Sequence, residues 1–251
     1  MDMRWEEAGW ERLAPGVGRR RMPGWDATIG LVAGARGALL YDTGSSLREG
    51  AEVRTQAEAL LGRRVTHVAL GHPHFDHVLG TGAFAGVEVF AASGMDVLLT
   101  TQRDALADDA ARQGVPHDAA VEAAELLRAP RHLVSDERTL DLGSGRGVLF
   151  ANLGPAHSGH DLVALVPGLR GGPGVVFCGD LVEESGEPQA GHDAVGGRWP
   201  EALDRLLALG GEDAVYVPGH GAVVDAAFVR AQRDALARRF GVSRPVARPV
   251  S

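Results

Sequence analysis

The sequence predicts an α/β protein in which two β-sheets are covered by outer helices. Short apolar runs of strand length recur along the chain, and helical patterns are inserted between groups of them. Strands and helices do not alternate strictly, as they would around a single parallel sheet, so two sheets are favoured. The chain has 251 residues, 45% of them apolar and 23% charged. We therefore expect a single domain over residues 1–251 with a sizeable core.

The first half of the chain begins with a hairpin and continues with a helix and two strands. A glycine-containing turn joins the first two strands, and the helix has capping-box spacing from Ser46 and a stop at Gly62. Strands are expected over residues 27–33, 38–42, 65–70 and 87–91. An alanine-rich helical insertion is then expected near residues 95–130.

The second half returns to short strands and closes with helices. Strands are expected over residues 147–153, 161–166, 174–178 and 214–217. Helices are expected over residues 200–209 and 224–240. The tail over residues 245–251 is punctuated by proline, and we expect it to be frayed.

Composition excludes several classes of protein and partner. The net charge of −8 does not favour a nucleic-acid groove, so no nucleic-acid partner is expected. No apolar run approaches the roughly 18 residues of a membrane span, so no membrane partner is expected. The N-terminus lacks a secretory signal pattern, which predicts a cytoplasmic protein. The single cysteine, Cys178, excludes an internal disulfide framework and a cysteine-rich zinc module. A homodimer is left open.

The clearest chemical signal follows the predicted strand that ends at Leu70. Three histidines and one aspartate occupy six residues there: His72, His74, Asp76 and His77. Imidazole and carboxylate are preferred ligands of zinc, iron and manganese. In an extended backbone the first three alternate onto one face, whereas His77 starts a helix and points elsewhere. One loop can therefore supply ligands to two metal ions.

Three further strand ends carry residues of the same ligand types. His157 follows the strand ending at Leu153, Asp180 follows an apolar run through Phe177, and His220 follows a Pro-Gly pair. Each is weak alone, because strand ends are usually polar. Four strand ends that all carry a ligand type are much less easily explained by chance.

These residues, taken in order and spacing, resemble the metallo-β-lactamase superfamily over most of the chain. The resemblance rests on His72-x-His74-x-Asp76-His77, then His157, then Asp180, then Pro-Gly-His220, with Asp42-Thr43-Gly44 earlier. It implies a four-layer αββα sandwich of two mixed sheets with helices outside and the metal site at one edge.

The resemblance also implies a ligand set for two divalent metal ions. The first ion would bind His72, His74 and His157, and the second would bind Asp76, His77 and His220, with Asp180 bridging both. Zinc is expected, with iron and manganese as alternatives. Asp42 would orient a ligating histidine, and His160 is either a neighbour of the ligands, a substrate-facing residue or a turn residue. No substrate-binding residue is predicted.

The implied reaction is hydrolysis of a small molecule by a hydroxide that bridges the metal ions. Such a hydroxide would attack the carbonyl carbon of an ester, thioester, lactone or amide. Asp76 and Asp180 are the catalytic candidates, first as ligands, and Asp76 also as a group that handles a proton.

Other activities of this fold remain as alternatives. One is a mononuclear iron oxygenase of the persulfide dioxygenase type, a second is a phosphodiesterase, and a third is a metal-dependent interaction protein without catalysis. Among hydrolase branches, the best-known zinc β-lactamases place cysteine where this chain has Asp180. Glyoxalase II has a helical C-terminal domain, whereas only 31 residues follow His220 here. The tyrosine of acyl-homoserine lactonases has no counterpart after Asp180.

Overall fold

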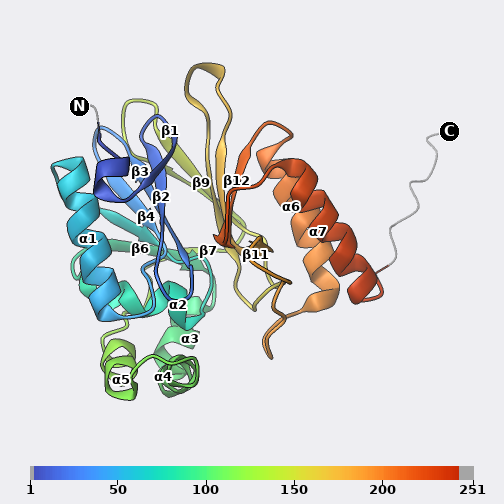
Figure 1. The fold of residues 1–251 in the computed structure, drawn as a ribbon, viewed down its shortest axis with the longest axis horizontal. Helices are drawn as coiled ribbons and strands as arrows, with labels where there is room; N and C mark the ends of the chain where they lie inside the picture. The colour runs from blue at the N-terminus through green and yellow to red at the C-terminus, as the bar shows by residue number, and fades with distance from the viewer. Residues whose placement is uncertain (1–2, 243–251) are drawn as a thin grey trace.

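The computed structural model describes residues 3–242 and contains two mixed β-sheets that pack face to face (Figure 1). Within these residues, one sheet has seven strands in the order β1-β2-β3-β4-β5-β6-β7. The other has five strands in the order β12-β11-β10-β9-β8. Antiparallel pairs dominate the first half of the larger sheet, and β4 to β7 run parallel. In the smaller sheet only β11 and β12 are parallel.

The larger sheet contains the strands of the first half of the chain. They are β1 (Glu11–Ala14), β2 (Val17–Arg21), β3 (Thr28–Ala33), β4 (Ala38–Tyr41), β5 (His67–Ala69), β6 (Glu88–Ala92) and β7 (His132–Val134). The smaller sheet contains β8 (Glu137–Asp141), β9 (Gly147–Asn152), β10 (Leu162–Val166), β11 (Val175–Glu183) and β12 (Val215–His220).

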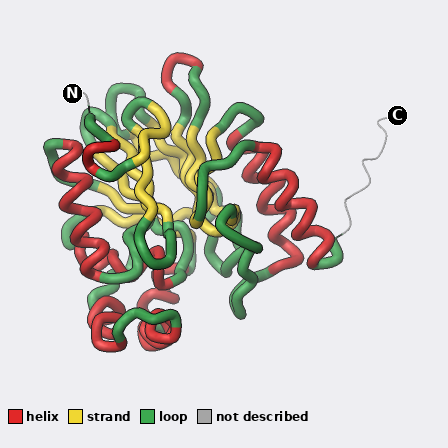
Figure 2. Tube along the Cα trace, in the orientation of Figure 1, coloured by secondary structure: helices red, strands yellow, loops and turns green. Residues whose placement is uncertain are grey.

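Helices cover the outer face of each sheet, so that the molecule has four layers (Figure 2). Helix α1 (Leu47–Leu61) lies against the larger sheet, and α6 (Trp199–Gly210) and α7 (Ala226–Arg239) lie against the smaller one. The remaining helical segments are η1 (Glu6–Ala8), α2 (Phe75–Val78), η2 (Leu79–Phe84), α3 (Met95–Thr101), α4 (Arg103–Arg112), α5 (His117–Glu125), η3 (Leu169–Gly171) and η4 (Gly196–Arg198). This is the αββα sandwich that the resemblance implied.

Three apolar core layers, made of buried side chains, fill the spaces between the sheets and helices of the sandwich. The middle one lies between the sheets, where Phe90, Phe150 and Phe177 pack and the rings of Tyr41 and Phe177 stack at 5.5 Å. The two outer layers join each sheet to its helices. Because both faces of each sheet are covered, the central strands are apolar along their whole length rather than alternating.

The helical insertion consists of α3, α4 and α5, which end at Glu125. Helices α4 and α5 pack on each other below the larger sheet, at the end where α2 lies (Figure 1). The tail over residues 245–251 lies outside the described residues. No helix within residues 3–242 is long and apolar enough to cross a bilayer.

The strands differ from the expectation in number and in bounds. Strands β1, β2, β7 and β8 were not expected, and β2 is an inner strand in which Arg19 is 2% exposed. Its guanidinium is satisfied by Glu11 Oε2 at 2.7 Å and by the carbonyl of Gly221 at 2.8 Å. Strand β11 also continues past Asp180 to Glu183, because it keeps pairing with β12 after a bulge at Gly179.

Candidate metal centre

The loop after β5 delivers four ligand-type side chains to one end of the sandwich. His72 and His74 lie between β5 and α2, and Asp76 and His77 lie within α2, which is a single turn of 4 residues. His74 has an extended backbone, with φ of −88° and ψ of 150°, immediately before the helix. The change from extended to helical backbone sends the four side chains in different directions.

Asp42 fixes this loop from the end of β4. Its Oδ1 accepts a hydrogen bond from the Gly71 amide at 2.7 Å, and its Oδ2 lies 2.8 Å from Nδ1 of His77. A carboxylate accepts hydrogen bonds, so Nδ1 of His77 donates, and Nε2 is the nitrogen left to bind a metal ion. Asp42 is 1% exposed, so water does not compete for these bonds.

His220 is oriented in the same way at the end of β12. Its Nδ1 lies 2.7 Å from the carbonyl oxygen of Trp25, so this nitrogen donates and Nε2 is free. The bond from Arg19 to the Gly221 carbonyl holds the next residue of the same turn. His77 and His220 therefore present Nε2 atoms to each other, 3.4 Å apart.

His74 and His157 face each other on the other side of the cluster. Nε2 of His157 lies 3.1 Å from Nδ1 of His74. The other nitrogen of His74, Nε2, lies 3.2 Å from a carboxylate oxygen of Asp193. Asp193 therefore sets the tautomer of His74 opposite to that of His77, with Nδ1 free. The ring of His157 packs against Trp199 with centroids 5.2 Å apart.

A buried carboxylate shapes the turn that carries His157. Asp161 accepts hydrogen bonds from the Ala156 amide, the Ser158 amide and the Ser158 hydroxyl, at 2.8 to 3.0 Å. Burial raises the pKa of Asp161 to about 7, against the lowering effect of these bonds. The turn is thus held by its own side chains as well as by backbone hydrogen bonds from Leu153 and Gly154 to the Asp161 carbonyl.

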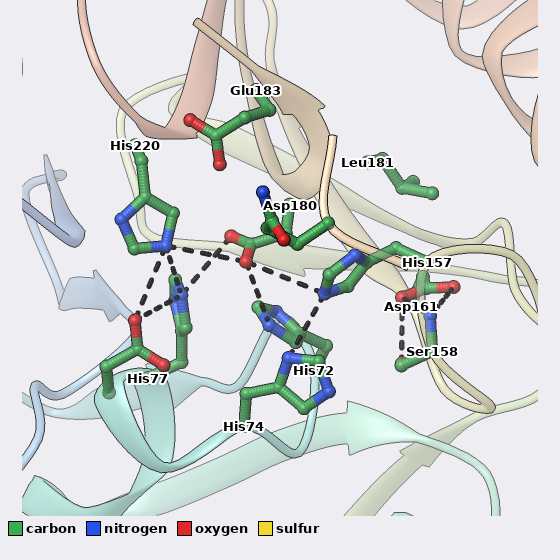
Figure 3. Close-up of polar contacts among 12 residues, drawn as sticks. His72, His74, His77, His157, Ser158, Asp161, Asp180, Leu181, Glu183 and His220 are labelled. Carbon is green, nitrogen blue, oxygen red and sulfur yellow. Dashed lines mark hydrogen bonds and ion pairs between the residues drawn. The ribbon is translucent and has the colours of Figure 1, made fainter. Parts of the chain in front are cut away.

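Asp180 lies at the centre of the cluster, between the histidines (Figure 3). Its Oδ1 is 3.2 Å from Nε2 of His77, and its Oδ2 is 3.4 to 3.5 Å from Nε2 of His72, His157 and His220. Gly219 makes room for this carboxylate, because a Cβ at position 219 would lie 1.8 Å from Oδ1 of Asp180. Glycine is required there by close approach.

The donor atoms of the predicted ligands form two groups that could each hold a metal ion, and a third, overlapping group joins Glu183 to Asp180 and His220. Within each group all donor atoms lie within 4.8 Å of one another. One group consists of His72, His74, His157 and Asp180, and the other of Asp76, His77 and His220. Because Asp180 also contacts His77 and His220, its carboxylate lies between the two groups.

Hydrogen bonding within the protein does not satisfy this cluster. His72 is 1% exposed, and neither of its ring nitrogens has a hydrogen-bond partner among the described residues. Buried polar atoms are rarely left unpaired. Imidazole nitrogens that converge with carboxylate oxygens at 3.1 to 3.6 Å suit a borderline divalent cation. The residues present therefore fit two metal ions.

The electrostatics of the metal-free cluster are dominated by burial and by the central carboxylates. Burial lowers the pKa of His157 to about 4. Burial would also lower the pKa of His220, but Asp180 raises it to about 9. Burial would likewise lower the pKa of His77, but the nearby carboxylates, Asp76 above all, raise it well above its usual value. Burial would raise the pKa of Asp180, but the surrounding histidines hold it well below its usual value.

A cleft of about 560 Å³ opens above the cluster. Asp76, His157, Asp180 and His220 form its floor, and the loop that follows β11 forms much of its wall. The helical insertion also reaches it, since Asp109 and Gln113 at the end of α4 line the cleft. Phe75 also lines the cleft, and Trp25 packs edge-on against Phe75 with ring centroids 5.4 Å apart.

The seven residues predicted as metal ligands lie together in these groups, and Asp42 lies against His77 and Gly71. His160 lies apart: its Nδ1 is 3.0 Å from the Ser93 carbonyl, which joins its loop to the end of β6. Cys178 packs in the outer apolar layer under α6 and α7.

Sequence reasoning missed two carboxylates of this end of the molecule, Asp161 and Glu183, and the role of a third, Asp193. The sequence around Asp193 favours a solvated loop, with lining of the cleft as the alternative, and Asp193 does line the cleft. Asp193 is 119 residues from His74, its partner, so no local pattern links the two. Glu183 was hidden because β11 was expected to end before it. Only Asp161, four residues after His157, gave a local signal, as an acceptor in a turn rich in glycine and serine.

Comparison with known proteins agrees with the fold and gives the family. The sequence model of the metallo-β-lactamase superfamily matches residues 22–220. The structure is similar to the metallo-β-lactamase FIM-1 from Pseudomonas aeruginosa in its mono-zinc form, with a TM-score of 0.68, 19% identity and coverage of 93% of this chain and 96% of that one. A metallo-β-lactamase from Pontibacter korlensis gives 0.67 and 22%, over 90% and 97% of the chains, and one from Hirschia baltica gives 0.64 and 18%, over 90% and 96%. No curated protein sequence matches the chain.

Proposed function

Because the chain belongs to the metallo-β-lactamase superfamily, we propose that it is a hydrolase that holds two zinc ions and cleaves a small ester, thioester, lactone or amide. The position of Asp180 carries this proposal. One carboxylate that contacts both groups of donors would serve as a shared ligand of two cations. The family assignment supports a metal-dependent hydrolase, and the central position of Asp180 favours two ions over one.

The residues of the chain have separate roles in this reaction. His72, His74, His157 and Asp180 would hold the first ion, and Asp76, His77, His220 and Asp180 the second. When bound, two such ions acidify water and polarise the substrate carbonyl. Asp42, Asp193 and the Trp25 carbonyl hold the imidazoles in the tautomers that ligation needs.

Asp76 is placed to handle the proton that hydrolysis transfers to the leaving group. Its carboxylate lines the cleft, and its Oδ2 lies 3.4 Å from Nε2 of His220 and 3.6 Å from that of His77. The second oxygen, Oδ1, has no such contact among the described residues. It can accept a proton from water at the cleft floor and return it to the departing oxygen, sulfur or nitrogen.

The test is hydrolysis by zinc-loaded protein of a panel of esters, thioesters, lactones, amides and β-lactams. We expect at least one class to be cleaved, and we expect Asp180→Ala and His74→Ala each to reduce kcat/KM by more than about 1,000-fold. His117→Ala is the matched control, because His117 is exposed on α5 and far from the donor groups. A zinc-loaded protein that cleaves no member, or a fully active Asp180→Ala variant, would contradict the proposal.

Measurements on the same purified protein distinguish the iron oxygenase alternative from the hydrolase. The oxygenase requires one iron ion per chain and oxygen consumption with a persulfide, and it leaves the second donor group without a role. The phosphodiesterase alternative is separated by including a phosphodiester in the panel.

A further inference from the structure

We propose that the cleft selects substrates that carry a positively charged group, such as an ammonium, beside the scissile bond, and that Glu183 and Glu187 bind this group. The inference rests on the proposed hydrolase function, because it names the class of substrate that the same cleft would accept. It comes from the charges and free hydrogen-bond acceptors of the wall, which the two-metal chemistry leaves unused.

The wall of the cleft, above the proposed metal ions, is acidic. None of the described residues that line it is an arginine, and the sequence contains no lysine. Beyond Asp76 and Asp180, the lining contains four carboxylates: Asp109, Glu183, Glu187 and Asp193. An anionic substrate group at this wall, away from the metal ions of the floor, would meet like charges and no arginine or lysine, and such juxtapositions oppose binding.

Two of these carboxylates are already engaged. Asp193 lies against Nε2 of His74 at 3.2 Å, and Asp109 accepts a hydrogen bond from Arg112 at 3.0 Å. Glu187 is exposed at the rim, and no described residue donates to its carboxylate. Glu183 and Glu187 therefore remain to receive a group of the substrate.

Glu183 is the deeper of the two and is held rigidly. Its residue is 8% exposed, and its Oε1 accepts hydrogen bonds from the Ser185 amide at 3.0 Å and from the Ser185 hydroxyl at 2.6 Å. Its Oε2 receives no hydrogen bond from the described residues. Figure 3 shows this carboxylate pointing toward His220 and Asp180 at the cleft floor. A buried acceptor that is fixed on one oxygen and free on the other is prepared for a donor from outside the chain.

The position of Glu183 also predicts where the substrate carries its positive charge. Its carboxylate is within 4.8 Å of the donor atoms of Asp180 and His220. A substrate whose carbonyl lies over Asp180 thus reaches Glu183 and then Glu187 with a group only a few bonds from the scissile bond. Esters and thioesters of amino alcohols, and acyl groups with an amine near the carbonyl, have this form.

The experiment compares acetylthiocholine with its neutral isostere, 3,3-dimethylbutyl thioacetate, on the zinc-loaded protein. Both have the same scissile bond and nearly the same shape, so their ratio of kcat/KM reports the charge alone. We expect about a tenfold preference for the cation, falling toward one in Glu183→Gln and partly reduced in Glu187→Gln. Glu125→Gln is the control, because Glu125 is exposed on α5, outside the cleft, and its replacement changes the net charge equally.

Direct binding separates this inference from the proposed function. Calorimetric titration of the zinc-loaded protein with choline and with 3,3-dimethylbutan-1-ol needs no turnover. Preferential binding of choline that Glu183→Gln abolishes would support the inference even if no member of the hydrolysis panel is cleaved, a result that would contradict the hydrolase. Equal binding and equal cleavage of cation and isostere, or a preference that Glu183→Gln leaves unchanged in a folded, zinc-loaded variant, would overturn the inference and leave the hydrolase standing.

Discussion

At the scale of single residues, the candidate metal centre depends on groups that orient the histidines without themselves being predicted metal ligands. Asp42, Asp193 and the Trp25 carbonyl each bind the outer nitrogen of one histidine and thereby decide which inner nitrogen is free. The ligand types at positions 72 to 77 were predictable from the sequence, because histidine and aspartate rarely gather without a role. The tautomers were not, because each depends on a partner from a distant element.

The substitution Asp42→Asn tests this control of tautomers. It would keep the size of the side chain and the bond from Gly71, but the new amide group would offer a donor to Nδ1 of His77. His77 would then carry its proton on Nε2, which cannot bind a metal. We expect the affinity of the second zinc to fall by about 10- to 100-fold while the first is retained, measured by competition with a chelator. Equal loss at both sites, or no loss, would contradict the assignment.

The pKa of His220 predicts how zinc binding depends on pH. In the metal-free protein Asp180, against the effect of burial, raises this pKa from 6.5 to about 9, so a zinc ion must displace a proton at neutral pH. We expect the affinity of the second zinc to rise by up to about tenfold per pH unit up to about pH 9, with proton release. Zinc titrations in several non-coordinating buffers measure both, and an affinity that is flat between about pH 6.5 and 9 would contradict this account.

The pair of His220 and Asp180 also affects the stability of the metal-free protein, but in the opposite direction: this contribution to stability falls as the pH rises. Because the folded pKa of His220 lies above 6.5, its protonated form stabilises the fold fully below about pH 6.5. That contribution is lost as the pH rises through about 9. Zinc therefore becomes more important for stability in the same range in which it binds more tightly, and melting curves with and without zinc should diverge as the pH rises.

At the scale of elements, the ends of β4, β11 and β12 and the loop after β5 place the ligands. The sequence predicted the end of β4 well, because its apolar run is unambiguous. It placed the ends of the other two strands at residues 178 and 217, whereas β11 continues to Glu183 and β12 to His220. It did not predict β1 and β2, whose residues Glu11, Arg12, Arg19 and Arg20 are charged. Strand β2 buries Arg19 only because Glu11 and the Gly221 carbonyl satisfy it, and such pairing across the fold leaves no periodic signal.

The approach of β12 to β11 can be tested at Gly219. A methyl group there would overlap Oδ1 of Asp180 and come within 2.9 Å of its backbone nitrogen. We expect Gly219→Ala to displace Asp180 and lower zinc binding at both groups, with native circular dichroism retained. Gly197→Ala is the matched control, because nothing lies within 4 Å of a Cβ at that position. Normal zinc content in Gly219→Ala would show that the close approach is not needed.

At the scale of the whole molecule, three apolar layers support a sandwich whose one end carries all the donor residues. The four-layer arrangement was predictable because the motif extends over most of the chain, and the family match over residues 22–220 agrees with it. The cleft wall was not predictable. It combines the end of α4 with the loop after β11, two segments that only the packing of the insertion brings together.

The central claim, two ions that share Asp180, is tested most directly by native mass spectrometry of metal-stripped protein titrated with zinc. The account predicts two zinc ions per chain in the wild type and one in His220→Ala. It also predicts weakened binding of both in Asp180→Ala. A single ion in the wild type, retained without change in His220→Ala, would contradict it.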